Sequence, residues 1–490
     1  MDPIFELNIC LPKNKGEQLQ QSIAQQLKTA IADGRLQANL NMPPSRKLAE
    51  HLGVSRNTVI AVYATLSSEG YLYSHAGAGT YVADIHQQQL KKVLQQTSSQ
   101  SALARQQQQQ KKLSAFWREQ SAPQFVVNNT PIEFDFSVGI PELGFFPFTL
   151  WRKLLTQASR LQEQGRLAAP IAAGQLSLRS AIAQHVSVSR AVACHIDNIV
   201  VTAGAQQALD ILARILITPG QTQVAMESPG YPFARHIFAA AGAKIIDVSV
   251  DEQGIVVEQI PANCKVIYVT PSHQFPTGVK MSAPRRLQLL AFAQQHSASI
   301  IEDDYDSEIR FQGSPLDALQ TLDNNGLVFY VGTFSKCLMP DLRLGFLVTP
   351  HWAREAIVTA KLYCDWHSPI LLQETLAMFI HQGHLVRHIQ KLRKCYHQRL
   401  DSLQWALEHY LKDKVEPIVI SSGAHMTALI TADFNAQALA NKVLQRGVKL
   451  YAINDLSNDS SNINGLIFGL GGIDNKLISE GIFRLSQCMA

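Results

Sequence analysis

Apolar side chains recur every three or four positions near the start of the chain, which is the spacing of an amphipathic helix. The first such segment holds Leu19, Ile23, Leu27 and Ile31, separated by Gln and Lys. Gly34 is predicted to end it, because glycine favours the conformation that closes a helix. The chain is therefore predicted to open with a helix that buries one face.

Two shorter helices are predicted next, with a glycine turn between them. Pro43-Pro44 prevents an earlier start, so the second helix is expected to begin at Ser45, which would act as its N-cap. Gly53 supplies the turn, and Ser55 is predicted to cap a third helix over residues 56–69. The inward face of this helix is predicted to carry Val59, Val62, Tyr63 and Leu66. Helix, turn and helix in this order form a helix-turn-helix motif.

A pair of short strands is predicted after the third helix. Residues 71–73 and 80–82 are rich in Tyr, Val and Thr and stand among glycines, which predicts a two-stranded hairpin, or wing. In this arrangement the start of the third helix enters the major groove, while the second helix and the wing contact the DNA backbone. The alternative is a packing module of three small helices. The candidate DNA contacts are Arg46, Lys47, Ser55, Arg56, Asn57, Thr58, Gly77 and Thr80.

From residue 131 onward, short apolar runs alternate with amphipathic segments. This alternation predicts an α/β fold with a mostly parallel sheet and helices on both faces. Ligands of such sheets bind beyond the carboxyl ends of the strands, so the informative residues are expected there. The runs predicted as strands are residues 199–202, 223–226, 244–248, 266–269, 299–302 and 327–331, with a helix at 204–217.

Residues 84–130 are rich in Gln and contain few large apolar side chains. Such a segment cannot bury enough apolar surface to offset the entropy of ordering, so a flexible linker is expected. It would join a DNA-binding domain at residues 1–83 to a large domain at residues 131–490. Its basic residues outnumber its acidic ones, and a solvated spacer is favoured over direct contact with DNA phosphates.

Whole-chain composition excludes several other classes of protein. A chain of 490 residues is expected to hold two or three domains. It shows neither a long apolar stretch nor a signal-peptide pattern, so a cytoplasmic protein without a membrane span is expected. Seven scattered Cys without a CxxC pair indicate neither a disulfide framework nor a zinc site. A net charge of +4 is too mild to indicate nucleic-acid binding, so that inference depends on the helix-turn-helix motif.

One lysine stands where an apolar run meets a turn. Lys336 follows residues 327–331, lies beside Thr333 and Ser335, and precedes Arg343. Apolar surroundings destabilise the ammonium form and make the amine a better nucleophile, as a Schiff-base lysine requires. The hydroxyls and the guanidinium would hold a phosphate, so the stretch indicates a pyridoxal phosphate site. The alternative is an exposed loop lysine near a structural arginine.

Two other predicted strand ends carry groups that would also bind pyridoxal phosphate. Gly204 permits close backbone approach, and the amides of Ala205 and Gln206 at a helix N-terminus would bind phosphate. Tyr231 stands on a turn of Pro and Gly, where its ring would stack on a flat ligand. A plain core tyrosine is the equal alternative.

A cluster of carboxylates follows the predicted strand at residues 299–302. One buried carboxylate there, Asp303 or Asp304, would keep a pyridine nitrogen protonated, and the Tyr305 hydroxyl would bond the phenolic oxygen of the ring. A divalent-metal site is the competing interpretation. We favour the coenzyme and expect no metal, because no His lies nearby in the sequence and Lys336 follows one strand later.

Two sets of motifs resemble known families. The order PPSRKLAEHLGVSRNTVIAVYATLSSEGYL resembles the GntR family of winged-helix transcription regulators over residues 17–83. The later motifs VTAGAQQAL, ESPGYP, TPSHQFPTG, IIEDDYDSE and GTFSKCLMPDLRLGF resemble the fold-type I aminotransferases in order and spacing. Together they resemble the MocR/GabR family of pyridoxal phosphate-dependent transcription regulators. The resemblance covers the whole chain except the linker.

The resemblance implies a role for each matching residue. Lys336 would form the Schiff base, Asp303 would face the pyridine nitrogen in preference to Asp304, Tyr305 would bond the phenolic oxygen, and Tyr231 would stack on the ring. It also implies a head-to-tail homodimer in which each winged helix rests near the large domain of the partner. The residues that would hold the phosphate are Thr333, Ser335, Arg343, Gly204, Ala205 and Gln206.

Two departures from the aminotransferase pattern affect the expected ligand. Phe275 stands where many aminotransferases carry Asn, so His273 or Gln274 would have to bond the ring oxygen. Residues 464–470 lack the Arg that grips the α-carboxylate of the substrate in many catalytic relatives. Losing such a clamp removes roughly 1.5 to 3 kcal/mol, so an α-amino acid is expected to bind weakly unless Arg235, Arg484 or another Arg substitutes. The effector candidates are Arg235, His273 and Gln274.

These inferences together predict a cytoplasmic regulator that binds double-stranded operator DNA and pyridoxal phosphate. An amine or amino-acid effector would attack the Lys336 Schiff base, free the lysine and change domain packing. In a second hypothesis pyridoxal phosphate itself is the signal, and the missing Arg favours this hypothesis. The third hypothesis is a working aminotransferase with a passive winged helix.

Overall fold

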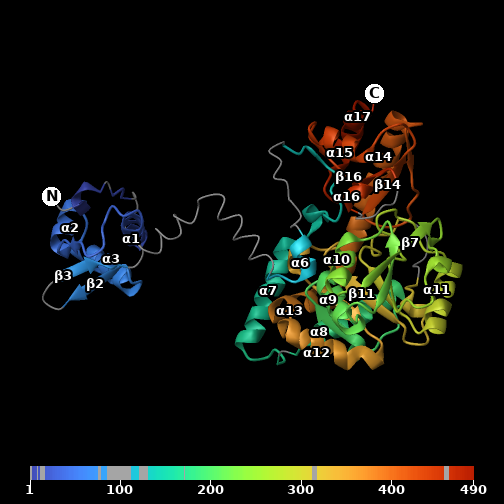
Figure 1. Ribbon diagram of the computed structural model, residues 1–490, viewed down its shortest axis with the longest axis horizontal. Coiled ribbons are helices and arrows are strands. Elements are labelled where there is room, and N and C mark those ends of the chain that lie inside the picture. The colour runs from blue at the N-terminus through green and yellow to red at the C-terminus, as the bar shows by residue number, and fades with distance from the viewer. Residues whose placement is uncertain are drawn as a thin grey trace. The chain divides into compact units, whose positions relative to one another are not determined.

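The computed structural model describes residues 3–7, 9–11, 17–75, 79–84, 112–120, 131–169, 171–311, 317–456 and 463–489. The chain divides into two compact units, Met1–Gln120 (unit 1) and Ser121–Ala490 (unit 2), which are drawn in Figure 1. Of the predicted linker, only residue 84 and residues 112–120 are described, and the latter include the short helix α6 (Ala115–Glu119). The flexibility of the linker therefore stays a prediction.

Unit 1 contains the three predicted helices, and α3 packs against both α1 and α2. Its core is formed by the apolar faces of these helices, including Leu48, Val59, Val62 and Leu66. The elements are α1 (Glu17–Ala32), β1 (Asn41–Met42), α2 (Ser45–Leu52), α3 (Arg56–Ser68), β2 (Leu72–His75) and β3 (Gly79–Val82).

The turn between α2 and α3 follows the predicted chemistry. Gly53 closes α2 with φ of 66°, a left-handed conformation that costs glycine little. The Ser55 hydroxyl accepts a hydrogen bond from the backbone N–H of Thr58 and so caps α3. The N-cap predicted for α2 was wrong, because Pro44 occupies that position and Ser45 is the first helical residue.

The wing contains one more strand than predicted. β2 and β3 form the expected antiparallel hairpin, and β1 pairs with β3 on its other side, giving the order β1-β3-β2. β1 has only two residues, Asn41 and Met42, too few for a periodic pattern in the sequence. This strand ties the segment before α2 to the wing.

Unit 2 is built on an eight-stranded sheet in the order β5-β12-β11-β10-β9-β6-β7-β8. The five central strands from β11 to β7 run parallel, β12 is antiparallel to both of its neighbours, and β8 is antiparallel to β7. The strands are β5 (Ile199–Thr202), β6 (Gln223–Ser228), β7 (Lys244–Asp251), β8 (Gly254–Ile255), β9 (Val266–Val269), β10 (Ser299–Asp304), β11 (Val328–Thr333) and β12 (Gly345–Val348).

Helices cover both faces of this sheet, so most strand residues are buried. α9, α10 and α12 pack on the face that carries Val200, Ile301 and Val331. The alternate residues of the strands pack against α8 and α11, with Val201 and Ile300 as examples. The helices before β13 are α7 (Phe148–Glu163), α8 (Leu176–Arg190), α9 (Ala205–Leu216), α10 (Pro232–Ala240), α11 (Ala283–His296), α12 (Arg354–Asp365), α13 (Ile370–His381) and α14 (His384–Leu411).

The end of the chain forms a smaller layer within unit 2, gathered at one end of it in Figure 1. Its sheet has the order β13-β14-β17-β16, and a short parallel pair joins β15 to β4. No helix within the described ranges combines the length and the apolar character of a membrane span. The elements are β4 (Phe134–Asp135), β13 (Val415–Pro417), β14 (His425–Ile430), α15 (Ala436–Leu444), β15 (Val448–Lys449), β16 (Tyr451–Ala452), α16 (Ile453–Leu456), β17 (Gly465–Gly469) and α17 (Ile478–Ser486).

Candidate functional site

A cavity of about 200 Å³ opens where the carboxyl ends of β10 and β11 meet. Parallel strands deliver their last residues to one edge of a sheet, so predicted residues far apart in the sequence become neighbours. Nine of the ten proposed cofactor contacts line this cavity, namely Lys336, Asp303, Tyr305, Tyr231, Ala205, Gln206, Thr333, Ser335 and Arg343.

Lys336 projects from the turn that follows β11. Its Nζ donates a hydrogen bond to the carbonyl oxygen of Gly139 at 3.3 Å. A Cβ at Gly139 would displace this Nζ, and the φ of Gly139 is +84°, a conformation that favours glycine. Burial holds the pKa of Lys336 below its usual value, although Asp306 and Asp303 act in the opposite direction. A larger share of neutral amine makes this lysine more nucleophilic.

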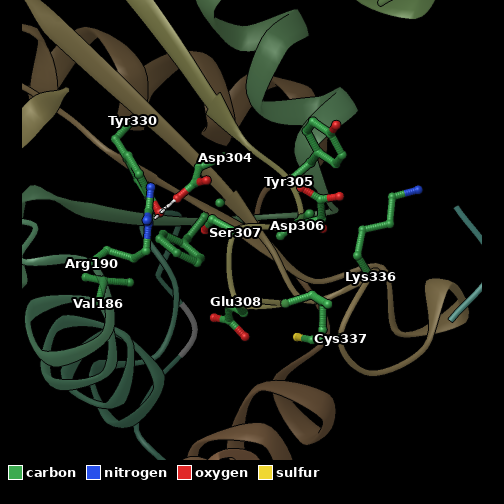
Figure 2. A pocket seen from close by; sticks show the side chains of 14 residues that line it. Val186, Arg190, Asp304, Tyr305, Asp306, Ser307, Glu308, Tyr330, Lys336 and Cys337 are labelled. Atoms are coloured by element: carbon green, nitrogen blue, oxygen red, sulfur yellow. Dashed lines mark hydrogen bonds and ion pairs between the residues drawn. The ribbon is translucent and has the colours of Figure 1, made fainter. Parts of the chain in front are cut away.

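Asp303 and Asp304 face opposite sides of the sheet because side chains alternate along a strand. Asp304 accepts hydrogen bonds from Arg190 Nε at 2.7 Å and from the Tyr330 hydroxyl at 2.5 Å. Figure 2 shows its carboxylate directed toward Arg190, away from Lys336. Asp303 lines the cavity instead, so the preference for Asp303 has a geometric reason.

The Asp303 carboxylate is buried and only partly bonded. Tyr268 donates its hydroxyl to Oδ2 at 2.8 Å, while Oδ1 has no hydrogen-bond partner. Burial raises the pKa of Asp303 to about 7, although the Tyr268 hydrogen bond opposes the shift. A buried acceptor without a donor costs free energy, and a protonated ring nitrogen would satisfy it.

Groups suited to an anion gather at the other end of the cavity. The N-terminus of α9 presents the amides of Ala205 and Gln206, and Gly204 is its N-cap with φ of 84°. Gly204 does not line the cavity. A Cβ at Gly204 would stand 3.2 Å from Arg343 Nη2, and a Cβ at Gly345 would stand 3.0 Å from the Cα of Gly204. Glycine at these positions therefore lets α9 and Arg343 approach closely.

The hydroxyls of Thr333 and Ser335 lie in the same region. Thr333 Oγ1 donates to Ser335 Oγ at 3.1 Å and accepts from the Ser335 backbone N–H at 3.2 Å. Arg343 Nη2 donates to the Ala203 carbonyl at 2.9 Å. Helix amides, two hydroxyls and one guanidinium thus converge as a phosphate group requires.

The Tyr305 hydroxyl is held by His273. It donates to the His273 carbonyl at 2.9 Å and lies 3.2 Å from His273 Nδ1. That nitrogen donates to Asp306 Oδ2 at 2.9 Å, and Asp306 also accepts from the Ala424 backbone N–H at 2.9 Å. Burial alone would raise the pKa of Asp306, but His273, His425 and the Ala424 N–H together outweigh it, and the pKa lies below its usual value.

The sequence argument against a metal site was wrong in one respect. It found no His close to the carboxylate cluster, yet the fold brings His273 and His425 to Asp306, with one ligand atom of each within 4.8 Å of the others. The two rings lie 4.4 Å apart between centroids. Residue spacing did not reveal this buried triad, because His425 comes from β14 at the far end of the chain.

The three effector candidates, and Arg484 as a possible substitute for the missing Arg, lie outside the cavity lining. Arg235 forms an ion pair with Asp247, and Arg484 pairs with Glu480 at 3.1 Å. The Gln274 amide donates to the Pro229 carbonyl at 2.8 Å, and its oxygen accepts from Thr277, so it shapes the loop. His273 contacts Tyr305 without lining the cavity itself.

The strand predicted to lack a carboxylate-binding Arg is β17. Its Phe468 is fully buried, with its ring 5.6 Å from that of Phe136. Phe275, the other departure from the aminotransferase pattern, lines the cavity with its ring 5.6 Å from that of Tyr231.

In unit 1, the residues predicted to contact DNA differ in exposure. Arg46, Lys47, Arg56 and Asn57 are exposed on α2 and at the start of α3. The hydroxyls of Ser55 and Thr58 lie 2.8 Å apart within the helix cap. Thr80 on β3 bonds Ser74 across the wing at 3.1 Å, and Gly77 lies outside the described residues.

Comparison with known proteins accounts for both units. Residues 19–82 match the family of bacterial regulatory proteins, gntR family, and residues 131–458 match aminotransferase class I and II. The probable rhizopine catabolism regulatory protein MocR of Rhizobium meliloti is 33% identical over 97% of this chain and 95% of its own length. The chain belongs to the MocR-like family of HTH-type transcriptional regulators.

Further relatives support this MocR-like assignment. The HTH-type pyridoxine biosynthesis transcriptional regulator PdxR of Corynebacterium glutamicum is 29% identical over 99% of both chains. Kynurenine aminotransferase of Pyrococcus horikoshii, solved in complex with PMP, has a TM-score of 0.71 and 26% identity, over 77% of this chain and 97% of its own. The predicted fold, a gntR-type winged helix joined to a fold-type I aminotransferase domain with a mostly parallel sheet, is confirmed.

The cavity fits the coenzyme that this MocR-like fold implies. The unbonded Asp303 Oδ1 offers an acceptor to a ring nitrogen, and Lys336 offers an amine beside a glycine that leaves it room. The anion-binding end formed by α9 and Arg343 suits a phosphate.

The two adjacent aspartates allow a matched test. Asp304→Asn should lower the free energy of unfolding of the coenzyme-free protein by about 3 kcal/mol or more, since Arg190 would lose its carboxylate partner in the core. Asp303→Asn should change it by less than about 1 kcal/mol at neutral pH, because Asn still accepts from Tyr268 and removes a carboxylate that burial already disfavours. Urea unfolding followed by tryptophan fluorescence measures both. Equal losses in the two variants would contradict the assignment of the two side chains to opposite faces.

Proposed function

We propose that this protein is a pyridoxal phosphate-dependent transcription regulator of the cytoplasm. It binds double-stranded operator DNA through its winged helix and holds the coenzyme as a Schiff base at Lys336. It senses an amine or amino-acid effector, or the coenzyme itself, and acts as a homodimer, with head-to-tail packing as the expected form.

The observation that carries this proposal is that Lys336 and Asp303 face one cavity. A nucleophilic amine and a buried carboxylate with a free oxygen are the two groups that a pyridine aldehyde needs. The coenzyme would supply an electrophilic carbon and an electron-withdrawing ring. Asp303 would hold a proton at the ring nitrogen, Tyr305 would contact the phenolic oxygen, and Tyr231 would pack on the ring.

The DNA-binding half of the proposal is supported by exposed side chains on a capped helix. Arg56 and Asn57 stand in the first turn of α3, where the recognition helix of a helix-turn-helix meets base edges. Arg46 and Lys47 on α2 would contact phosphates. Thr80 and Gly77 of the wing would contact the adjacent backbone.

Coenzyme attachment should depend on Lys336 alone. After incubation with pyridoxal phosphate and borohydride, mass spectrometry should place one phosphopyridoxyl group on the peptide that contains Lys336, and Lys336→Ala should carry none. Lys280→Ala is the matched control, because burial also holds the pKa of Lys280 below its usual value although it lies outside the cavity lining. An adduct of equal yield in Lys336→Ala would refute the site.

DNA affinity should depend on Arg56. On a duplex enriched from random sequence by the wild-type protein, Arg56→Ala should weaken binding by about tenfold or more at fixed salt, since a bidentate base contact contributes about 1 to 3 kcal/mol. Fluorescence anisotropy measures this. Arg35→Ala removes another exposed guanidinium, from the loop after α1, and should leave affinity within about twofold. Coenzyme uptake should stay unchanged in both variants, and its loss with DNA binding would contradict separate sites.

A working aminotransferase is the second candidate, because Lys336 and Asp303 are also the groups that transamination uses. As a regulator, the protein should release at most one keto acid per bound coenzyme when mixed with amino acids. Sustained turnover at ordinary enzyme rates, roughly 1 s⁻¹ or faster, would establish the enzyme instead. Sensing of the coenzyme itself requires that the coenzyme-free and loaded proteins differ in operator affinity.

A further inference from the structure

One wall of the cavity is main chain packed directly on main chain. Val138 and Gly139 line the cavity. A Cβ at Gly469, the last residue of β17, would collide with the Ser137 carbonyl, and a Cβ at Gly471 would collide with the Ile140 carbonyl. The segment 137–140 therefore lies against these glycines, and no longer side chain fits between them. A guanidinium cannot enter the cavity from the end of β17.

The guanidinium of Arg399 contacts this wall, but its hydrogen bonds are made to the main chain behind the cavity. Arg399 on α14 donates to the carbonyls of Leu470 at 2.8 Å and Gly471 at 3.1 Å, and it forms an ion pair with Glu142. These bonds stabilise the wall, and Arg399 itself does not line the cavity.

The cations of the lining can be counted within the described part of unit 2. There, Lys336 and Arg343 are the only Lys or Arg that line the cavity. Arg343 lies beside Gly204 at the anion-binding end. The segments of unit 2 outside the description, residues 121–130, 170, 312–316, 457–462 and 490, contain no Lys or Arg in the sequence.

The region around Lys336 is anionic. Asp303 and Asp306 both line it. The contact with His273 favours the charged form of Asp306, whereas burial disfavours charge on Asp303, so Asp306 carries the negative charge there. His425 also lines it, but burial lowers the pKa of His425 to about 3, so its ring is neutral at physiological pH. Such surroundings attract an ammonium group and repel a carboxylate.

The remaining walls are apolar and aromatic. Phe275 stands at their centre, with ring centroids 5.6 Å from Tyr231, 6.2 Å from Tyr305 and 5.6 Å from His425. Val138 adds an aliphatic surface. Faces of this kind pack against hydrocarbon or aromatic groups and offer no charge to an acid.

We propose that the effector recognised beside Lys336 is a primary amine with an apolar or aromatic body and no carboxylate next to its amino group. This inference rests on the proposed coenzyme site and names its ligand class. The amine would occupy the anionic region by its nitrogen and the Phe275 wall by its hydrocarbon.

Matched pairs of compounds test this directly on the full-length, coenzyme-loaded protein. 2-Phenylethylamine is compared with L-phenylalanine, and n-butylamine with L-norvaline, so that each pair differs only by the carboxylate. The concentration that half-changes the visible absorption of the bound coenzyme is measured. Each amine should act at a concentration at least about tenfold lower than its amino acid, because the acid would be desolvated without a charged partner.

A charge-gain variant separates charge from shape. Val138→Arg places a guanidinium on the half-exposed wall and should reduce the amine preference by about tenfold, since a charge-assisted hydrogen bond would become available to the acid. Val138→Leu adds bulk without charge and should keep the wild-type preference.

The experiment distinguishes failure of the amine proposal from failure of the coenzyme site. Borohydride trapping on the same sample reports loading, and a protein that does not load refutes both proposals. A loaded wild type that responds equally to both members of a pair, prefers the amino acids, or responds to neither overturns the amine proposal alone. An unchanged preference in a loaded Val138→Arg protein would also overturn it.

Discussion

The buried ion pair between Arg190 and Asp304 is the interaction on which the cavity depends. Arg190 is the last residue of α8, and Asp304 is the last residue of β10, so the pair fixes the end of the strand against one face of the sheet. Because side chains alternate along a strand, this orientation directs Asp303 to the other face. A register shift by one residue would turn Asp303 away from the cavity and Asp304 away from Arg190.

The carboxylates near the end of β10 are thereby placed in distinct electrostatic environments. Asp304 meets a guanidinium, Asp306 meets an imidazole, and Asp303 meets a single tyrosine hydroxyl. Burial disfavours charge on Asp303, whereas His273 stabilises it on Asp306. Three carboxylates within four residues thus need not act alike, because their partners come from different elements of the fold.

The sequence predicted the sheet well where apolar runs are bounded by turn residues. Residues 266–269 and 199–202 were assigned as strands with the bounds that the structure has, and the Gly53 turn and the Ser55 cap follow from local chemistry. β1 and the antiparallel β12 were missed. β1 is too short for a pattern, and pairing between β12 and β5 joins segments far apart in the chain.

The site was predictable where it depends on strand ends and obscure where it depends on distant contacts. Lys336, Asp303 and Tyr305 follow apolar strands, so their convergence was expected from the fold class. Arg235 was a candidate to replace the missing Arg, but it forms an ion pair with Asp247 on β7. His425 could not be anticipated, since spacing carries no information about a ring that arrives from another sheet.

The contact between Lys336 and Gly139 ties the cavity to the first described residues of unit 2. Gly139 stands only a few residues after Pro131, where the described chain of unit 2 begins, and the intervening β4 is anchored by pairing with β15. Residues 131–139 therefore lead through β4 to Val138 and Gly139, which line the cavity. A ligand that engaged the amine would free that carbonyl, and the segment from Pro131 to Gly139 would lose its bond to the cavity wall.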